Sequence, residues 1–338
     1  MTAAPLLSVR DLEVEFAIER GLFRKPDVLR AVAGVSFDLA QGETLGVVGE
    51  SGCGKSTLGR AVLRLLPAAA GRVAWLGDDL ATLGEAAMRA RRREMTIIFQ
   101  DPLASLDPRM TVGDIIAEPI VTHEPGLSRA ERRARVEAMM GQVGLAPEMV
   151  NRYPHEFSGG QAQRIGIARA MILNPRMIVC DEPVSALDVS IQAQIVNLLM
   201  RLQRQFGLSL IFISHDLSIV RHIASRVMVL YLGRMMEIAP RDEIYRNPRH
   251  PYTQALISAV PVPDPDRERA KTRIVLSGDL PSPLRPPSGC VFRTRCPKAQ
   301  DVCARDVPPP LEIGPGHRVA CHFRDDSPMV TAGAAGGV

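Results

Sequence analysis

The sequence is poor in aromatic residues, which make up 4% of its 338 residues and include a single tryptophan. Proteins that bind single-stranded nucleic acid stack bases on aromatic side chains interleaved with basic ones. The formal net charge of +4 is modest, and the arginines are dispersed, with one group at 91–93 and another at 132–135. We interpret these arginines as solvated helix faces, so nucleic acid is not an expected partner.

Long apolar runs are also missing. None reaches the roughly 18 residues that a membrane-spanning helix needs. The start, residues 1–5, lacks a basic region followed by an apolar block, so no signal peptide is predicted. At 46% hydrophobic residues, a chain of this length can bury one large core and an appendage. We therefore expect a soluble, cytoplasmic protein.

A glycine-rich loop follows the apolar stretch 44–48. Its pattern is G-x-x-x-x-G-K-[ST], formed by Gly49, Glu50, Ser51, Gly52, Cys53, Gly54, Lys55, Ser56 and Thr57. A buried strand, a glycine turn and then a helix through Leu58, Val62 and Leu65 is the setting in which this pattern binds phosphate. The glycines let the backbone wrap a phosphate, Lys55 supplies a positive charge, and Ser56 offers a hydroxyl to Mg²⁺. The expected ligands are ATP and Mg²⁺.

A second apolar strand, residues 177–180, ends in the two carboxylates Asp181 and Glu182. A continuous apolar run is typical of a strand buried in a parallel sheet, where functional groups gather at the carboxyl ends. Asp181 is predicted to hold Mg²⁺ through water, and Glu182 to polarise the attacking water. Because phosphoryl transfer needs a positioned nucleophile, the presence of Glu182 predicts a working ATPase.

Between these motifs stands a short segment, Ser158, Gly159, Gly160 and Gln161, followed by a helical run through residue 170. Ser158 is predicted to be the N-cap, so that the segment presents backbone N–H groups to an anion at the positive end of the helix. The segment resembles the signature of ABC-transporter ATP-binding subunits. That resemblance implies that it closes on the γ-phosphate bound to the opposite subunit of a dimer.

The resemblance implies roles for three more positions. Gln100, after the predicted strand 96–99, matches the Q-loop glutamine that contacts Mg²⁺ and the water and links the site to the transmembrane partner. Asp188, at the end of Ser185-Ala186-Leu187-Asp188, matches the D-loop at the dimer interface. His215, after the predicted strand 210–214, matches the switch histidine that reaches the γ-phosphate.

Adenine in this family stacks on an aromatic side chain from an early strand. Phe16 is the best match, because the alternation over residues 12–16 predicts a strand. A core position for Phe16 is the alternative, and Phe23 lies in a loop nearby.

The order of motifs predicts an α/β fold with a P-loop NTPase core of the ABC ATPase type over residues 6–245. Residues 101–170 are expected to form a mostly helical subdomain, in which Ser128 and Glu131 make a capping box. Strands and helices alternate again over 171–240, ending in the strand 226–231 and a turn at Gly233. Residues 246–325 form a Pro- and Cys-rich C-terminal extension with little secondary structure, and 326–338 is expected to be a disordered tail.

The C-terminal extension indicates which group of ABC ATPases the chain resembles. The stretches 247–256 and 289–296, together with 99–102 and 106–110, resemble the ATP-binding subunits of dipeptide and oligopeptide importers, and the likeness covers roughly residues 6–325. It implies an ATP hydrolase that powers peptide uptake. Nickel, glutathione or another small solute is the alternative, because the ATPase subunit does not touch the solute.

Six cysteines complete the sequence. Cys53 and Cys180 are interpreted as small buried residues. The other four, Cys290, Cys296, Cys303 and Cys321, cluster in a segment too rich in proline to build a core, which in a reducing cytoplasm favours metal over disulfides. Their spacing is unlike paired zinc knuckles, so we favour a 4Fe–4S cluster, with zinc or plain thiols as alternatives. His317 is predicted to be an ordinary surface residue.

The partners follow from the resemblance. They are a second ABC ATPase subunit, identical or different, two transmembrane permease subunits and, indirectly, a solute-binding protein. The expected location is peripheral, on the cytoplasmic face of the plasma membrane. A soluble, non-transport ABC ATPase is an alternative, but it would usually carry two fused ATPase domains or a long coiled-coil insertion, and this sequence shows neither. A non-hydrolysing regulatory module would be expected to lack Glu182 or His215, and this sequence has both.

Overall fold

The computed structural model describes residues 4–19, 26–261 and 264–324. They divide into two compact units, each built from several stretches of chain. The described residues of unit 1 fall within Met1–Leu7, Asp38–Thr44 and Ala74–Ser214, and those of unit 2 within Ser8–Phe37, Leu45–Val73 and His215–Val338. The expected disordered tail, 326–338, lies outside the described residues.

Unit 1 contains three parallel strands with β7 in the middle. They are β6 (Met95–Ile98), β7 (Met177–Asp181) and β8 (Ser209–Ile213). In register, Ile178 of β7 lies opposite Thr96 of β6 and Leu210 of β8. Every residue of β7 and β8 is buried. The three predicted strands are confirmed to within a residue or two at each end, and their carboxyl ends share one edge of the sheet.

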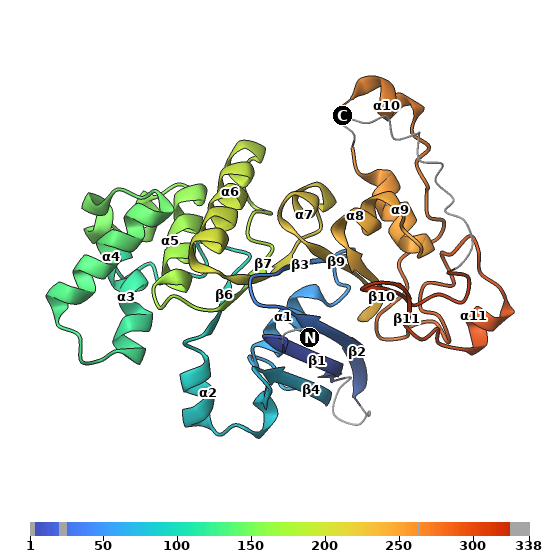
Figure 1. Ribbon diagram of the computed structural model, residues 1–338, viewed down its shortest axis with the longest axis horizontal. Helices are drawn as coiled ribbons and strands as arrows, with labels where there is room; N and C mark the ends of the chain where they lie inside the picture. Colours follow the sequence, from blue (N-terminus) through green and yellow to red (C-terminus); the bar gives the residue numbers. More distant parts are fainter. Residues whose placement is uncertain (1–3, 20–25, 262–263, 325–338) are drawn as a thin grey trace. The chain divides into compact units, whose positions relative to one another are not determined.

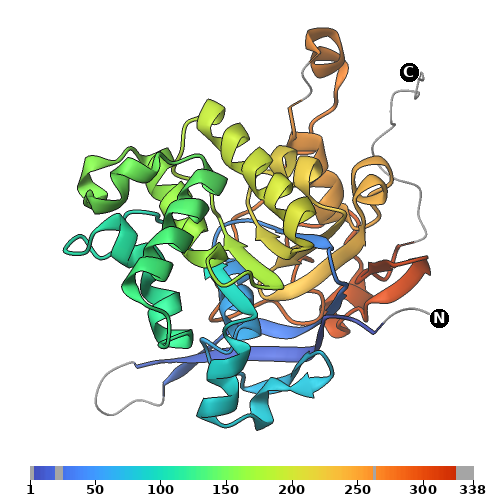
Figure 2. The same cartoon turned by 60° about the vertical axis from the view of Figure 1, so that its left-hand side comes forward.

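Helices make up the rest of unit 1. Three of them, α3, α4 and α5, contact one another and lie together in both ribbon views (Figure 1, Figure 2). The capping box at Ser128 is present, since its hydroxyl accepts from the Glu131 N–H and the Glu131 carboxylate accepts from the Ser128 N–H. The helices and short elements of unit 1 are α2 (Glu85–Arg91), α3 (Val112–His123), α4 (Arg129–Val143), α5 (Gly159–Met171), α6 (Val189–Phe206), β5 (Asp78–Asp79) and the 3₁₀ turns Leu80–Thr82, Pro147–Asn151 and Pro154–Glu156.

Unit 2 holds most of two sheets. In one, the order β2-β1-β4 is formed by β1 (Leu7–Ile18), β2 (Asp27–Leu39) and β4 (Ala70–Trp75). In the other, β3 (Thr44–Val48) pairs in parallel with β9 (Arg226–Tyr231), and β10 (Arg234–Pro240) returns antiparallel to β9. Helices α1 (Lys55–Val62) and α7 (Leu217–Ile223) belong to the same unit.

The C-terminal extension has more secondary structure than its proline content predicts. Helix α8 (Arg241–Arg246) leads into it, and it contains α9 (Pro251–Ala259), α10 (Pro265–Ala270) and α11 (Asp301–Arg305). The hairpin of β11 (Leu311–Gly314) and β12 (His317–Val319) adds to the edge of β10 through β12. The prediction of little regular structure was therefore wrong. Two of the prolines begin helices, where a missing N–H costs nothing.

The predicted surface position of His317 was also wrong. This side chain is 4% exposed, and its Nε2 lies 2.7 Å from Oε1 of Glu237, which is fully buried in β10. The same carboxylate accepts the backbone N–H groups of Arg249 and His250, each at 2.9 Å. A buried carboxylate is tolerated when its oxygens are hydrogen-bonded. Glu237 thus ties the start of the extension to its final hairpin.

No helix in the described ranges combines the length and the apolar character that crossing a membrane requires.

Candidate nucleotide site

The predicted phosphate loop lies between β3 and α1 in unit 2. Gly49 has a φ of 155°, and a Cβ there would stand 2.2 Å from the carbonyl oxygen of Leu230. Gly54 has a φ of 100°, and its Cβ would stand 2.1 Å from the carbonyl oxygen of Ala31. Only glycine fits either position, so the backbone can curl tightly enough to surround a phosphate. The helix that follows ends at Val62, earlier than predicted.

Lys55 is folded back onto this loop. Its side chain is 4% exposed, and Nζ donates to the carbonyl oxygens of Gly49 at 2.8 Å and Glu50 at 3.0 Å. Cys53 is buried as predicted, and burial raises the pKa of its thiol. Ser56 and Thr57 occupy the first turn of α1. The loop thus keeps a buried cation and a helix N-terminus next to each other, a combination suited to a polyphosphate.

Two predicted site residues meet at the sheet edge of unit 1. Gln100 follows β6 and Glu182 follows β7, and Nε2 of Gln100 lies 3.4 Å from Oε2 of Glu182. Asp181, the last residue of β7, is fully buried. Glu182 has a φ of 45°, which is rare for a residue other than glycine and clusters at functional sites. Parallel strands thus bring an amide and a carboxylate together from positions 82 residues apart.

Cys180 precedes these two carboxylates in β7. It is fully buried, and burial raises the pKa of its thiol. The prediction that it is a small buried residue is confirmed.

The Ser-Gly-Gly-Gln segment begins α5 as predicted. Ser158 is the N-cap: its hydroxyl accepts from the Gln161 N–H at 3.4 Å, and its N–H donates to Oε1 of Gln161 at 3.0 Å. A Cβ on Gly160 would approach Cγ2 of Ile191 to 2.6 Å, so α6 packs closely against this turn. Asp188, the residue before α6, is exposed.

Phe16 and His215 are the remaining predicted positions. Phe16 lies on β1, as expected, with a half-buried side chain. Its alternative, Phe23, lies outside the described residues. His215 is exposed and directly precedes Asp216, whose carboxylate caps α7.

Sequence reasoning missed two residues of the extension that contact the phosphate loop. The Tyr252 hydroxyl accepts the N–H of Glu50 at 3.0 Å, and Nη1 of Arg295 donates to the Glu50 carboxylate, 2.8 Å from its Oε2. No local pattern signals either contact, because 202 and 245 positions separate the partners.

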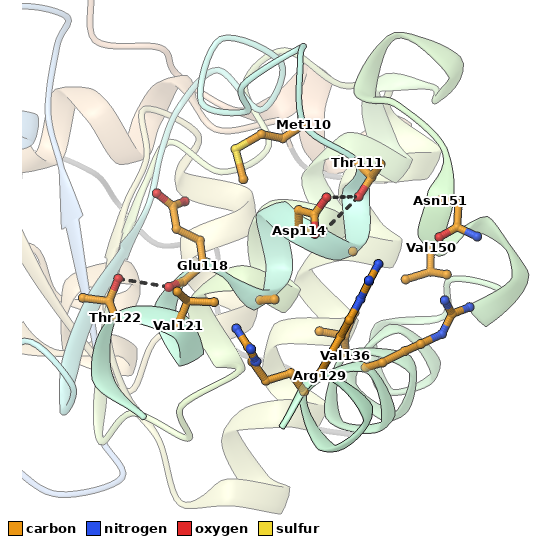
Figure 3. Close-up of a pocket in the computed structure, with 14 residues that line it drawn as sticks. Met110, Thr111, Asp114, Glu118, Val121, Thr122, Arg129, Val136, Val150 and Asn151 are labelled. Carbon is orange, nitrogen blue, oxygen red and sulfur yellow. Dashed lines mark hydrogen bonds between the residues drawn. The ribbon is translucent and has the colours of Figure 1, made fainter. Parts of the chain in front are cut away.

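A groove of about 580 Å³ opens in the helical part of unit 1 (Figure 3). Val121, Val136 and Val150 supply apolar surface, while Asp114 and Arg129 are among its charged residues. Asp114 is held in place by Thr111, whose hydroxyl donates to its Oδ2 at 2.7 Å. The groove thus combines apolar and charged groups.

The phosphate loop, the acidic strand end and the capped signature helix together are the marks of an ABC-type ATPase cassette. Family models agree with this class of protein. The model described as "ABC transporter" matches residues 32–185, and the one described as "Oligopeptide/dipeptide transporter, C-terminal region" matches residues 236–303.

Two similar proteins show the family to which the chain belongs. The oligopeptide transport ATP-binding protein OppF of Escherichia coli is 60% identical over 319 residues, which cover 94% of this chain and 95% of that protein. The oligopeptide transport ATP-binding protein AppF of Bacillus subtilis is 54% identical, with 96% and 99% covered. The chain belongs to this family of ATP-binding subunits of ABC transporters.

Solved structures agree on the fold. The dimeric ATP-binding cassette MJ0796 in a post-hydrolysis state, bound to ADP and Pi, matches with a TM-score of 0.62 at 25% identity, covering 70% of this chain and 98% of that one. The cbiO1 subunit of Clostridium perfringens, part of the transporter complex cbiONQ, also has a TM-score of 0.62. The structural match covers less of the chain than the match to the oligopeptide proteins does.

Proposed function

We propose that this protein hydrolyses ATP to power the uptake of dipeptides or oligopeptides through partner membrane proteins. The observation that carries the proposal is the 60% identity to an oligopeptide transport ATP-binding protein over 94% of the chain. The match of residues 236–303 to the C-terminal region of oligopeptide and dipeptide transporters supports the same substrate class. We place the ATPase domain at 6–245 and the extension at 246–325.

The site residues then take the following roles. The loop Gly49–Thr57 cradles the phosphates of ATP, since a Cβ at Gly49 or Gly54 would fill the space its backbone needs. Lys55 supplies the charge, and Ser56, Asp181 and Gln100 hold Mg²⁺, which neutralises charge on the transferred phosphoryl group when bound. The remaining roles fall to Glu182, which orients the attacking water, His215, which contacts the γ-phosphate, and Phe16, which stacks on adenine.

The signature helix acts on the nucleotide of a partner subunit. Its first-turn N–H groups at Gly159 and Gly160 point along the helix axis toward an incoming anion, as at other helix N-termini. The similar cassette MJ0796 is dimeric. Asp188 and the 82% exposed Val189, at the start of α6, belong to the same interface in this proposal. The partner is a second ABC ATPase, identical or different.

The groove on α3 and α4 is the proposed docking site for the permease. A short segment of a transmembrane subunit would place apolar side chains on Val121 and Val136 and pair its charges with Asp114 and Arg129. The two permease subunits would receive solute from a binding protein, and this chain would sit at the cytoplasmic face of the membrane. Gln100, whose Nε2 lies 3.4 Å from Oε2 of Glu182, is the residue proposed to link the permease to the catalytic carboxylate.

The test of the proposed function is uptake of a labelled peptide by vesicles. We expect vesicles that contain both permease subunits, this chain and its partner ATPase to accumulate a labelled tripeptide only when ATP faces the ATPase subunits and the solute-binding protein is present on the other side. Vesicles without this chain are the control. Accumulation of nickel or glutathione in place of peptide would contradict the peptide assignment.

We further propose that the four cysteines of the extension hold a 4Fe–4S cluster. They are free thiols. Burial raises the pKa of the Cys296 thiol to about 11. In the part of the chain that the structure describes, no three potential ligands converge on a single ion. The proposal rests on the sequence spacing of the four cysteines, whose gaps of five, six and seventeen residues are unlike the paired C-x₂-C spacing of zinc knuckles.

Protein purified without oxygen is expected to be brown and to contain iron and acid-labile sulfide. Replacing Cys296 with Ser should bleach it and speed proteolysis beyond residue 247, because the cluster ties the extension together. Cys180→Ser, at a buried cysteine of unit 1, is the control and should keep the colour. Colourless protein with stoichiometric zinc would replace the cluster by a zinc site, and metal-free protein with four titratable thiols would remove the metal proposal.

A further inference from the structure

The phosphate loop contains an acidic side chain at a position where a polyphosphate would be repelled. Glu50 follows Gly49 and precedes the turn that leads to Lys55. A carboxylate beside a bound triphosphate raises the free energy of the complex, since like charges repel more strongly at a partly buried site than in water. Glu50 therefore needs a compensating charge.

Arg295 of the C-terminal extension provides that charge. Its Nη1 lies 2.8 Å from Oε2 and 3.1 Å from Oε1 of Glu50. The Arg295 side chain is 11% exposed and that of Glu50 is 29% exposed, so water screens this pair only in part. The pair is the kind of charge-assisted contact that holds its geometry, unlike a freely exposed surface pair.

The backbone of Glu50 is held on both sides. Its N–H donates to the Tyr252 hydroxyl at 3.0 Å, and its carbonyl oxygen accepts from Nζ of Lys55 at 3.0 Å. The first contact comes from the extension and the second from the loop itself. Together they set the orientation of the peptide group between Glu50 and its neighbours, whose N–H groups must converge on phosphate.

Both extension residues are anchored in a buried aromatic cluster. Tyr252 meets Tyr231 edge-on, with ring centroids 4.8 Å apart, and Phe292 meets Tyr231 at 5.3 Å. All three side chains are fully buried. The guanidinium of Arg295 lies 6.0 Å from the Tyr231 ring centroid. Aromatic packing of this kind restricts side-chain motion, so the extension presents the Tyr252 hydroxyl and the Arg295 cation from fixed positions.

We propose that Arg295 and Tyr252 are positioning residues for nucleotide binding: Arg295 neutralises Glu50, and Tyr252 fixes the backbone of the phosphate loop. In this proposal the C-terminal extension contributes two side chains that position the phosphate loop for ATP binding. The inference rests on the proposed role of the phosphate loop in binding ATP.

The test is the affinity of the purified full chain for MgATP, measured by calorimetry, together with KM and kcat. Arg295→Met is expected to weaken MgATP binding about tenfold, because Glu50 is left uncompensated. KM should rise while kcat changes little, since Gln100 and Glu182 are untouched. Tyr252→Phe should weaken binding by a smaller factor, about threefold, because it removes one neutral hydrogen-bond acceptor.

A double variant tests whether Arg295 acts by neutralising the Glu50 charge or only by holding the phosphate loop in place. Glu50→Gln combined with Arg295→Met is expected to bind MgATP within about threefold of the parent, because the repulsive carboxylate is gone as well. Arg295→Lys, which keeps the charge, should behave similarly. A double variant no better than Arg295→Met alone would overturn the proposal, as would parent-like affinity of Arg295→Met.

Two controls complete the design. Arg293→Met removes a cation from the same segment, where Arg293 Nε donates to the Ser288 carbonyl oxygen at 3.0 Å, and its affinity should stay at the parent value. Lys55→Ala should lose MgATP binding regardless of Arg295. If Lys55→Ala binds normally, the phosphate-loop assignment itself fails, which distinguishes that failure from a failure of the Arg295 proposal. Thermal melting of each variant confirms that it folds.

Discussion

Replacing Glu182 with Gln is expected to lower ATP turnover by about 10² to 10⁴ while MgATP binding is kept, because an amide cannot polarise the attacking water. This corresponds to a barrier higher by about 2.7 to 5.4 kcal/mol. Glutamine has the same shape, and Gln100, whose Nε2 lies 3.4 Å from the Glu182 carboxylate, can still contact the new side chain. The measurement is steady-state ATPase activity together with MgATP affinity.

A variant of the phosphate loop distinguishes a loss of MgATP affinity from a loss of catalytic turnover. Lys55→Ala should weaken MgATP affinity itself, because it removes the buried cation that contacts Gly49 and Glu50. Turnover of Glu182→Gln within a few-fold of the parent would mean that another group orients the water. Gln100 would then be the next residue to replace.

Replacing Ser158 with Arg is expected to abolish ATP-driven closure of the dimer and to lower ATPase activity by about 10² or more, because a bulky side chain covers the N–H groups that contact the partner's phosphate. The chain's own phosphate loop should bind MgATP as before. Closure is measured by crosslinking in a Glu182→Gln background, where bound ATP persists, with the partner ATPase present.

Ser128→Arg is a closely matched control. Ser128 caps α4 with the same capping box that Ser158 makes on α5, so both variants lose a cap worth about 1 kcal/mol. Only Ser158 belongs to the signature, so Ser128→Arg should still close on ATP. Loss of MgATP binding by isolated Ser158→Arg would mean that the signature acts on its own subunit's nucleotide.

The parts of the fold that could be predicted have local causes. The strand before the phosphate loop and the strand that ends at Asp181 are short apolar runs followed by glycine or acidic residues. The caps at Ser128 and Ser158 depend on two side chains three residues apart, one turn of a helix. Each signal lies within a few residues, so it can be read without knowing what packs nearby.

The pairing of Gln100 with Glu182 could be predicted only in part from the sequence. Each residue is recognisable from the strand it follows, and the parallel order of β6 and β7 then brings them together. The order of strands is a property of the whole sheet. The sequence predicted both residues, and the sheet supplied their contact.

The secondary structure of the C-terminal extension could not be predicted from sequence patterns. Its prolines predicted an irregular segment, yet β12 pairs with β10 and β11 pairs with β12, and His317 contacts the buried Glu237 from 80 positions away. A strand at a sheet edge gains its hydrogen bonds from a partner, so its own residues carry only part of the signal.

The sequence alone determined the class of ATPase, the phosphate loop, the acidic strand end and the signature helix, because glycine conformation, charge and helix capping act over short stretches of chain. Only the tertiary structure decided that Arg295 pairs with Glu50 and that Tyr252 holds the loop's backbone. Those contacts join residues more than 200 positions apart, and they exist because the aromatic cluster of Tyr231, Tyr252 and Phe292 packs the extension beside the phosphate loop.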